Sequence, residues 1–521
     1  MKTLEVDCLV IGTGLAGCVA ALELAERGRA VTLITRAEKP EETATSYAQG
    51  GIVFRGAPES TPDQLIRDIQ EAGAGICNEK AVRVLATDGP ALVEKILLKN
   101  LEIPFDRNED GALDTTGEAA HSTHRILHCG DQTGAAIEKA FLNELAKRKD
   151  VKILTRHTAV DLLTLAHHST RAQDQYEPSR CIGAYVFDQA KGEIVSVLAR
   201  YTVLATGGLG RLYLHTTNPV GARGDGMAMA YRTGARIMNL EYIQFHPTAL
   251  YRKTQDRFLI TEALRGEGAR LYNAAGEEFM KKYDPRGTLA PRDIVSRAIH
   301  DELLREESSH WVYLDISHKP ADWIRKRFPG VFAECLKEGI DITVSPIPVV
   351  PAAHYSCGGV FVDLDGRTTI RNLYAVGEVS CTGVHGANRL ASTSLLEDLV
   401  WGVRAGRAIA GELSASVPAL PPVRSWKPET EKVDADLLIQ DWVTIKHTMW
   451  NYVGLIRTPK RLERAQRILR ELSDEVQKFY AGSKLSDDLI GLRNGSTTAQ
   501  LIVTAALRNR QSLGCHFVRS D

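Results

Sequence analysis

The sequence lacks the features that mark several specialised classes of protein. No two of its nine cysteines stand at CxxC or CxxxxC spacing, which argues against a disulfide framework, a zinc ribbon and a redox-active dithiol. Lys and Arg total 64 and Asp and Glu total 65, so no overall charge favours nucleic acid or an anionic membrane. No apolar run of about 20 residues is present to span a bilayer. We therefore expect a reduced, cytoplasmic protein with no nucleic-acid or membrane partner.

The N-terminal stretch resembles a signal peptide in one respect, because Lys2 precedes the apolar run Leu9–Leu22. However, Glu5 and Asp7 stand before that run, and three spaced glycines interrupt it. Both properties are unusual for a secretion signal. We expect this stretch to belong to the folded protein.

The composition that remains is that of a multidomain globular protein. A chain of 521 residues is too long for one core, and its 44% apolar and 25% charged residues are ordinary values. At about 150 residues per domain, the length predicts three or four domains. The 43 glycines are clustered, which usually marks places where the backbone approaches another group closely.

The first glycine cluster lies inside a predicted βαβ unit, with strands at Val6–Ile11 and Ala30–Thr35 and a helix at Cys18–Arg27. The turn between them reads GxGxxG. Its first glycine makes the turn, its second lets backbone N–H groups approach a pyrophosphate, and its third lets helix and strand pack closely. A purely structural tight turn is the alternative. The context favours dinucleotide binding by Gly12, Thr13, Gly14, Leu15, Ala16 and Gly17.

One part of that pattern is missing. The second strand should end on an Asp or Glu that holds a ribose, but here it ends on Thr35 and Arg36, with Glu38 slightly beyond. This argues against a plain NAD site. A hydroxyl and a cation could instead hold the ribose or a phosphate of an adenosine, so Arg36 is a candidate cofactor residue.

Seven blocks of sequence occur in the order found in the flavoproteins of the succinate dehydrogenase and fumarate reductase family, which this chain resembles over nearly its whole length. Besides Gly12–Gly17 they are Ser46–Gly51, Ala205–Gly208, Gln244–Thr248, Thr261–Gly268, Tyr374–Glu378 and His385–Leu390. The resemblance implies an α/β fold: a Rossmann-like FAD-binding domain, interrupted by an α+β capping domain and followed by a C-terminal helical bundle domain.

The expected domain boundaries follow from this layout. The FAD-binding domain takes residues 1–238 and 353–412, and the capping domain, which would close over the flavin, takes 239–352. A proline-rich linker at 413–428 leads to a helical domain at 429–521, where Asp434–Tyr480 is heptad-like and charged.

At two positions the sequence resembles the subgroup of the family that oxidises L-aspartate. Many relatives attach FAD through a histidine six residues before Gly50, where this chain has Ala44, so FAD should be bound non-covalently. Glu118 falls where that subgroup carries a glutamate, and a carboxylate is what an α-ammonium group requires. The alternatives are a succinate dehydrogenase or fumarate reductase flavoprotein subunit, with an iron–sulfur partner, and a non-catalytic or RNA-associated flavoprotein.

The substrate implied by the resemblance is L-aspartate, whose two carboxylates need cations or strong donors. A lone histidine before proline, as in His246-Pro247, is more often a packed core residue, so the assignment depends on the resemblance. The implied substrate-binding residues are Gln244, His246, Thr261, His354, Arg389 and Ser392.

Arg292 is the implied acid–base residue, and Pro291 predicts that it lies in the first turn of a helix. An arginine with a pKa above about 12 is a poor proton shuttle, so its surroundings must destabilise the cation or relay the proton. Glu262 and Arg265 resemble such a relay, and Glu118 completes the implied catalytic set. The alternative is that Arg292 only clamps a carboxylate.

The implied reaction moves a hydride from Cα of L-aspartate to flavin N5, giving iminoaspartate, with O2 or fumarate as the electron acceptor. It is the first step of de novo NAD synthesis through quinolinate, so a quinolinate synthase is an expected partner of a monomer or weak homodimer. Further FAD contacts are expected from Thr45, Ser46, Tyr47, Ala48, Gln49, Gly50, Gly51, Asp225, Glu378, Ser394 and Leu395.

One histidine cluster has a spacing that could suit a metal site. His121, His124 and His128 are spaced i, i+3, i+7 beside Cys129, and could share a helical face. The residues before them are typical of a loop, and no acidic ligand is regularly spaced. We predict no metal, and expect His121 and His124 to line the substrate entrance.

Overall fold

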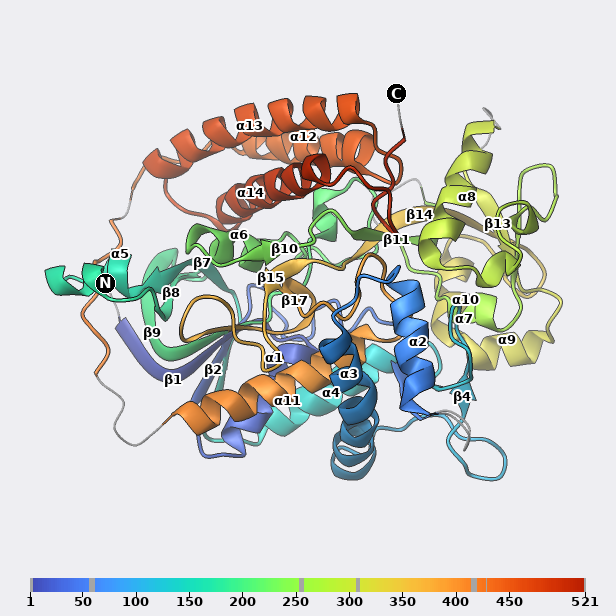
Figure 1. The fold of residues 1–521 in the computed structure, drawn as a ribbon, viewed down its shortest axis with the longest axis horizontal. Coiled ribbons are helices and arrows are strands. Elements are labelled where there is room, and N and C mark those ends of the chain that lie inside the picture. Colours follow the sequence, from blue (N-terminus) through green and yellow to red (C-terminus); the bar gives the residue numbers. More distant parts are fainter. Residues whose placement is uncertain are drawn as a thin grey trace.

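The computed structural model describes residues 3–55, 61–252, 257–305, 310–413, 419–427 and 429–519. Figure 1 shows a sheet and its covering helices on the left, a smaller unit containing α8 and β13 on the right, and the helices α12, α13 and α14 along the top. Within the described ranges, no helix combines the length and the apolar character needed to cross a membrane.

The largest sheet confirms the predicted βαβ unit. The first strand β1 (Thr3–Ile11) runs into helix α1 (Leu15–Ala25) and returns as β2 (Val31–Ile34), parallel to β1. Further parallel strands extend the sheet on both sides, and an antiparallel meander ends it. The parallel strands are β6 (Val151–Leu154), β9 (Glu193–Leu204) and β16 (Leu373–Ala375), and the meander is β7 (His157–Thr164), β8 (Cys181–Asp188) and β9.

Segments distant in the sequence pack into this unit. Helix α11 (Ser394–Glu412) crosses α1, and a Cβ atom on Gly402 would lie 2.8 Å from Val19 Cβ. Helix α4 (Thr133–Ala146) packs on α1 as well. Residues before 238 and after 353 therefore contribute to one apolar core, which also includes side chains of the C-terminal helices.

The unit on the right of Figure 1 has a core of its own, formed by apolar side chains between residues 250 and 349. Its antiparallel sheet has the order β11-β14-β13-β12, and helices cover it. The strands are β11 (Ile243–Leu250), β12 (Arg270–Tyr272), β13 (Val312–Asp315) and β14 (Ile347–Ser356); the helices are α7 (Ala263–Gly266), α8 (Arg292–Arg305), α9 (Ala321–Arg327) and α10 (Pro329–Lys337).

The C-terminal part is helical, as predicted, but its first heptad-like run is two helices. They are α12 (Ala435–Val453) and α13 (Pro459–Gly482), and α14 (Asp487–Arg508) follows. The break has a local cause, because the Thr458 side chain caps α13 and Pro459 occupies its first position. Of the expected linker, residues 414–418 and 428 lie outside the described residues.

Short elements complete the fold. Two three-stranded sheets consist of β3 (Ile52–Val53), β4 (Thr115–Thr116) and β5 (Ile126–Leu127), and of β10 (Ile237–Met238), β15 (Gly359–Phe361) and β17 (Ser380–Cys381). The remaining α-helices are α2 (Pro62–Ala72), α3 (Glu79–Leu92), which continues as a π-helix at Val93–Asn100, α5 (Leu165–His168) and α6 (Asp225–Arg232).

Candidate active site

One cavity gathers most of the residues singled out in the sequence. It lies at the carboxyl ends of β1, β2 and β9, where Ile11, Ile34 and Ala205 line it, and this edge of a parallel sheet is where dinucleotides bind. The predicted cofactor residues that line it are Gly12, Thr13, Gly14, Leu15, Ala16, Arg36, Thr45, Tyr47, Ala48, Gln49, Gly50, Gly51, Asp225, Glu378, Ser394 and Leu395.

Two predicted cofactor residues have other contacts. Gly17 serves the packing of α1 on β1, because a Cβ atom there would lie 2.3 Å from the Gly12 carbonyl oxygen. The Ser46 hydroxyl donates a hydrogen bond to the buried carboxylate of Glu138. Both residues therefore support the wall of the cavity from behind.

At the glycines the cavity wall is formed by backbone atoms without side chains. Gly12 has φ +119°, and a Cβ atom there would lie 2.0 Å from the Ala205 carbonyl oxygen. At Gly207, with φ +70°, an added Cβ atom would meet nothing within 4 Å. Gln49 Oε1 and Thr206 Oγ1 are buried, belong to lining residues, and have no hydrogen-bond partner among the residues described. A bare backbone with unsatisfied polar atoms suits a long polar cofactor such as FAD.

A buried carboxylate faces the same cavity from the loop after β4. Glu118 Oε2 accepts a hydrogen bond of 2.5 Å from the hydroxyl of Ser392, a residue with φ +55° just before α11. Burial, together with the negative charge of Glu262, raises the pKa of Glu118, and the bond from Ser392 opposes this rise. No ion pair to Glu118 forms among the residues that the structure describes, so its carboxylate is placed to hold either a proton or a positively charged ligand.

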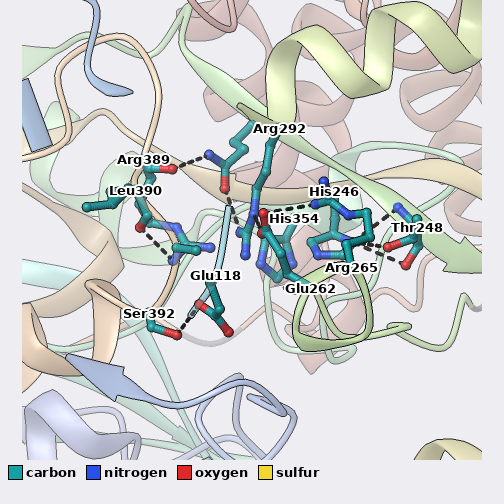
Figure 2. A network of polar contacts seen from close by, with 12 residues as sticks. Glu118, His246, Thr248, Glu262, Arg265, Arg292, His354, Arg389, Leu390 and Ser392 are labelled. Atoms are coloured by element: carbon teal, nitrogen blue, oxygen red, sulfur yellow. Dashed lines mark hydrogen bonds and ion pairs between the residues drawn. The ribbon is translucent and has the colours of Figure 1, made fainter. Parts of the chain in front are cut away.

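Arg292 and Arg265 share a second buried carboxylate. Arg292 is the first residue of α8, as predicted; its Nε donates to Glu262 Oε2 and its Nη1 donates to Gln244 Oε1 at 3.0 Å. Arg265 Nη2 lies 2.9 Å from Glu262 Oε1. Burial would raise the pKa of Glu262, but the two arginines hold it below its usual range. Figure 2 shows the three side chains as one connected group.

Gln244 and Arg265 stand behind this wall. Gln244 Nε2 donates to Asn388 Oδ1 and to the Arg389 carbonyl oxygen, both at 2.8 Å, so it ties Arg292 to the loop that carries Arg389. Arg265 Nη1 donates to the Thr288 carbonyl oxygen at 2.6 Å. The cavity wall itself is formed by Glu262 and Arg292, with Thr261 beside them.

Two histidines from adjacent strands complete one side. His246 on β11 and His354 on β14 have ring centroids 5.1 Å apart, and both line the cavity. Burial, and then the charge of Arg292, holds the pKa of each imidazole well below its usual range. Both rings are therefore neutral at physiological pH and offer N–H donors rather than charge.

Arg389 supplies the cation on the opposite side. Its guanidinium lies 4.6 Å from the centroid of the Tyr355 ring, and its Nη1 donates to Ser394 Oγ at 3.2 Å. Burial and the charge of Arg292 lower the pKa of Arg389 to about 10, so it stays cationic at neutral pH. Its buried Nε has no hydrogen-bond partner in the described part of the chain, and an anionic ligand would satisfy it.

The residues beneath Arg389 were not predicted. The Tyr355 hydroxyl donates to Glu397 Oε2 at 3.0 Å, and His385 Nε2 lies 2.8 Å from the same oxygen. These contacts fix the ring on which the Arg389 guanidinium stacks. His385 belongs to the His385–Leu390 block and Tyr355 follows His354, but nothing in the local pattern indicates that Glu397 joins them.

The three histidines near residue 121 contact neighbouring groups of the protein. His121 Nε2 contacts the Ala391 carbonyl oxygen at 3.0 Å, and burial lowers the pKa of His121 to about 4. His128 Nδ1 is bonded to Asp106 at 2.7 Å, and the His124 ring packs against Gly117. The described cavity wall includes Glu118 from this loop and neither His121 nor His124, so their expected place at the substrate entrance stays a prediction.

Comparisons with known proteins identify the family. The FAD binding domain model matches residues 7–395, and the model for the fumarate reductase flavoprotein C-term matches residues 443–521. The chain is 44% identical to L-aspartate oxidase 1 of Ralstonia nicotianae, over 98% of this chain and 95% of the relative. This chain belongs to the L-aspartate oxidase family. The L-aspartate oxidase of Pseudomonas aeruginosa is also 44% identical, over 98% and 94% of the two chains.

Solved structures place this L-aspartate oxidase family member in a wider fold group. FrdA of the E. coli quinol fumarate reductase superposes with a TM-score of 0.88 and 25% identity, covering 100% of this chain and 92% of that one. Sdh1 of Mycobacterium smegmatis gives a TM-score of 0.82 and 28% identity, over 99% and 89%. The predicted fold class is thereby confirmed, and FAD is the cofactor of this chain.

Proposed function

We propose that this protein oxidises L-aspartate to iminoaspartate in the cavity described above, with O2 or fumarate as the electron acceptor, as the first step toward quinolinate and NAD. The observation that carries the proposal is the position of Glu118, a buried carboxylate that forms no ion pair within the described part of the chain, in one cavity with the cations Arg292 and Arg389. A dicarboxylate needs the cations, whereas only an amino acid needs the additional carboxylate.

FAD would lie along the glycine-rich wall of the cavity. Besides the GxGxxG turn, this wall includes the glycine-containing segments Gln49–Gly51 and Gly207–Gly208. When bound, FAD supplies the hydride acceptor and so the redox chemistry. Ala44 also lines the cavity, and its methyl side chain offers no atom for a covalent link, which supports non-covalent binding. Glu378, whose pKa burial raises to about 7, is suited to donate to or accept from a hydroxyl of the cofactor.

The substrate's carboxylates would pair with Arg389 and Arg292 and accept hydrogen bonds from Thr261 and the neutral His246 and His354. The α-ammonium would then contact Glu118, and this third contact orients the Cα–H bond. A site with anchors at both ends and at the amino group discriminates L-aspartate from succinate, which would leave the Glu118 carboxylate without its cation.

The amine must lose a proton before hydride leaves Cα, because the product has a C=N bond. Glu118 is placed to accept that proton, since its raised pKa makes it a better base than an exposed carboxylate. In this direction Arg292 clamps a carboxylate. When fumarate is the acceptor, one carbon takes a hydride and the other needs a proton, and the Arg292–Glu262–Arg265 group is the proton path.

We also propose the domain layout, the cellular compartment and the partners of this protein. The domain boundaries are those given above, with the cap at 239–352 closing over the cavity. The protein works in a reducing cytoplasm. The nine cysteines support this, because all of them are free thiols. It acts as a monomer or weak homodimer and hands iminoaspartate to a quinolinate synthase.

The proposal is tested by supplying candidate substrates in air. Purified protein with L-aspartate should release hydrogen peroxide and, after hydrolysis of iminoaspartate, oxaloacetate, whereas succinate should release neither. Peroxide formation from succinate but not from L-aspartate would assign the chain to the dicarboxylate enzymes instead.

A further inference from the structure

A cluster of charged side chains lies where α14 reaches the cofactor cavity, and Asp487 is at its centre. Arg36 Nη2 lies 2.6 Å from Asp487 Oδ2, and Arg223 Nη1 lies 3.0 Å from the same oxygen. The Thr158 hydroxyl donates to Asp487 Oδ1 at 2.6 Å. One carboxylate of the C-terminal helical part thus binds three side chains of the FAD-binding part: Arg36 after β2, Arg223 before α6 and Thr158 on β7.

Two of these partners, Arg36 and Thr158, form part of the cavity wall. They line it beyond the end of β2, and so does Asp225, whose Oδ2 lies 2.9 Å from Arg223 Nη2. A second residue of α14, Asn494, donates to Asp225 Oδ1 at 3.0 Å. Helix α14 therefore supports this end of the cavity without lining it.

The sequence at the end of β2 explains why Arg36 needs a carboxylate from another part of the chain. The end of the second strand in a dinucleotide-binding βαβ unit is next to the adenosine ribose, and it usually carries an acid of its own. Here the position holds a cation, Arg36, with its side chain only 26% exposed. Asp487 both neutralises Arg36 and fixes its direction.

Asp487 stays ionised between its two arginine partners. Burial alone would raise the pKa of this carboxyl, but Arg223 and Arg36 hold it well below its usual range. Removing one partner from such a buried group leaves the remaining charges uncompensated, which is more disruptive than the loss of one exposed ion pair.

We propose that Asp487 is a positioning residue for FAD: from the C-terminal helix α14 it fixes Arg36 and Thr158 against the adenosine end of the cofactor. Docking of the C-terminal helices and FAD affinity are therefore coupled. The inference rests on the proposed function only in taking FAD as the ligand of this cavity, and it holds whichever substrate is oxidised.

The test compares Asp487→Asn with Asp488→Asn, which makes the same change on the exposed neighbouring residue of the same helix end. Full-length holoenzyme is diluted without substrate, and the free flavin measured by its fluorescence gives the Kd for FAD. Asp487→Asn should raise this Kd about tenfold or more, and Asp488→Asn should leave it within about twofold. An unchanged Kd in Asp487→Asn, or the same rise in both variants, overturns the proposal.

A double-mutant cycle separates positioning from general loss of structure. Because Asp487 acts partly through Arg36, combining Arg36→Leu with Asp487→Asn should raise the Kd by clearly less than the product of the two single changes, whereas effects that multiply in full contradict the proposal. Should Asp487→Asn fail to fold, Thr158→Val removes one hydrogen bond of the same carboxylate and should raise the Kd severalfold. A folded Thr158→Val protein with the parent's FAD Kd would then overturn the coupling. Because no substrate is present, failure of L-aspartate oxidation does not affect this readout.

Discussion

Replacing Glu118 by glutamine should weaken the oxidation of L-aspartate selectively. Glutamine keeps an oxygen that can accept the Ser392 hydroxyl, so the loop geometry is preserved while the charge is lost. A hydrogen bond between charged groups in a buried site contributes about 1.5–3 kcal/mol, so loss of the ammonium contact alone corresponds to a fall of roughly 10- to 150-fold in kcat/KM for L-aspartate. Loss of the proton acceptor adds to this fall and lowers kcat. Fumarate carries no ammonium, and its carboxylates would no longer meet the negative charge of Glu118, so its KM should stay constant or fall.

The assay measures peroxide release with L-aspartate and, separately, fumarate reduction by a chemically reduced dye. Because the pKa of Glu118 is raised, the ionised form that binds the ammonium develops only as pH rises, so KM for L-aspartate should fall with pH in the parent. That dependence should vanish in Glu118→Gln. Equal losses with L-aspartate and fumarate, or an unchanged pH profile, would refute the ammonium role.

Three further changes address other parts of the site. Arg389→Lys should raise KM for L-aspartate about tenfold in steady-state assays, because lysine cannot stack on Tyr355 and bind a carboxylate with two N–H groups at once; an unchanged KM would exclude it as an anchor. Arg292→Gln should raise KM for L-aspartate but abolish kcat for fumarate reduction, and the reverse pattern would contradict the proposed division of roles. Glu378→Gln should stabilise the FAD-free chain toward denaturant at about pH 8 by roughly 3 kcal/mol relative to its effect near pH 4. The sign follows because burial raises the pKa of Glu378 in the folded chain to about 7, above the value of about 4.3 in the unfolded chain. The contribution of Glu378 to the free energy of unfolding is therefore complete below about pH 4.3 and is lost as the pH rises through about 7. An equal effect of Glu378→Gln at the two pH values would argue against a buried carboxyl there.

Local sequence patterns predicted the parts of the site that local structure determines. The GxGxxG turn is set by strand, glycine and helix within one short stretch, and it appears as expected between β1 and α1. Pro291 placed Arg292 at the first position of α8 for the same reason. The resemblance to a known family brought Glu118 and Ser392 into one site, although 274 positions separate them.

Contacts between distant segments that carry no motif could not be predicted. Glu397 lies one turn into α11, and only the tertiary fold brings it under Tyr355. Asp487 looks like any acidic residue at a helix N-terminus, yet it neutralises Arg36 across 451 positions. Hydrophobic periodicity does not predict the break between α12 and α13, because the heptad-like pattern of Asp434–Tyr480 runs through it. The local sign of the break is Thr458, which caps the start of α13.

The central claim is that hydride leaves Cα of L-aspartate at the site formed by Glu118, Arg292 and Arg389. Anaerobic mixing of the holoenzyme with L-aspartate tests it directly, by following the loss of oxidised-flavin absorbance in a single turnover. The account predicts rapid bleaching by L-aspartate, slower bleaching when Cα carries deuterium, and none by succinate. Absence of bleaching by L-aspartate, or bleaching at the same rate with succinate, would contradict it.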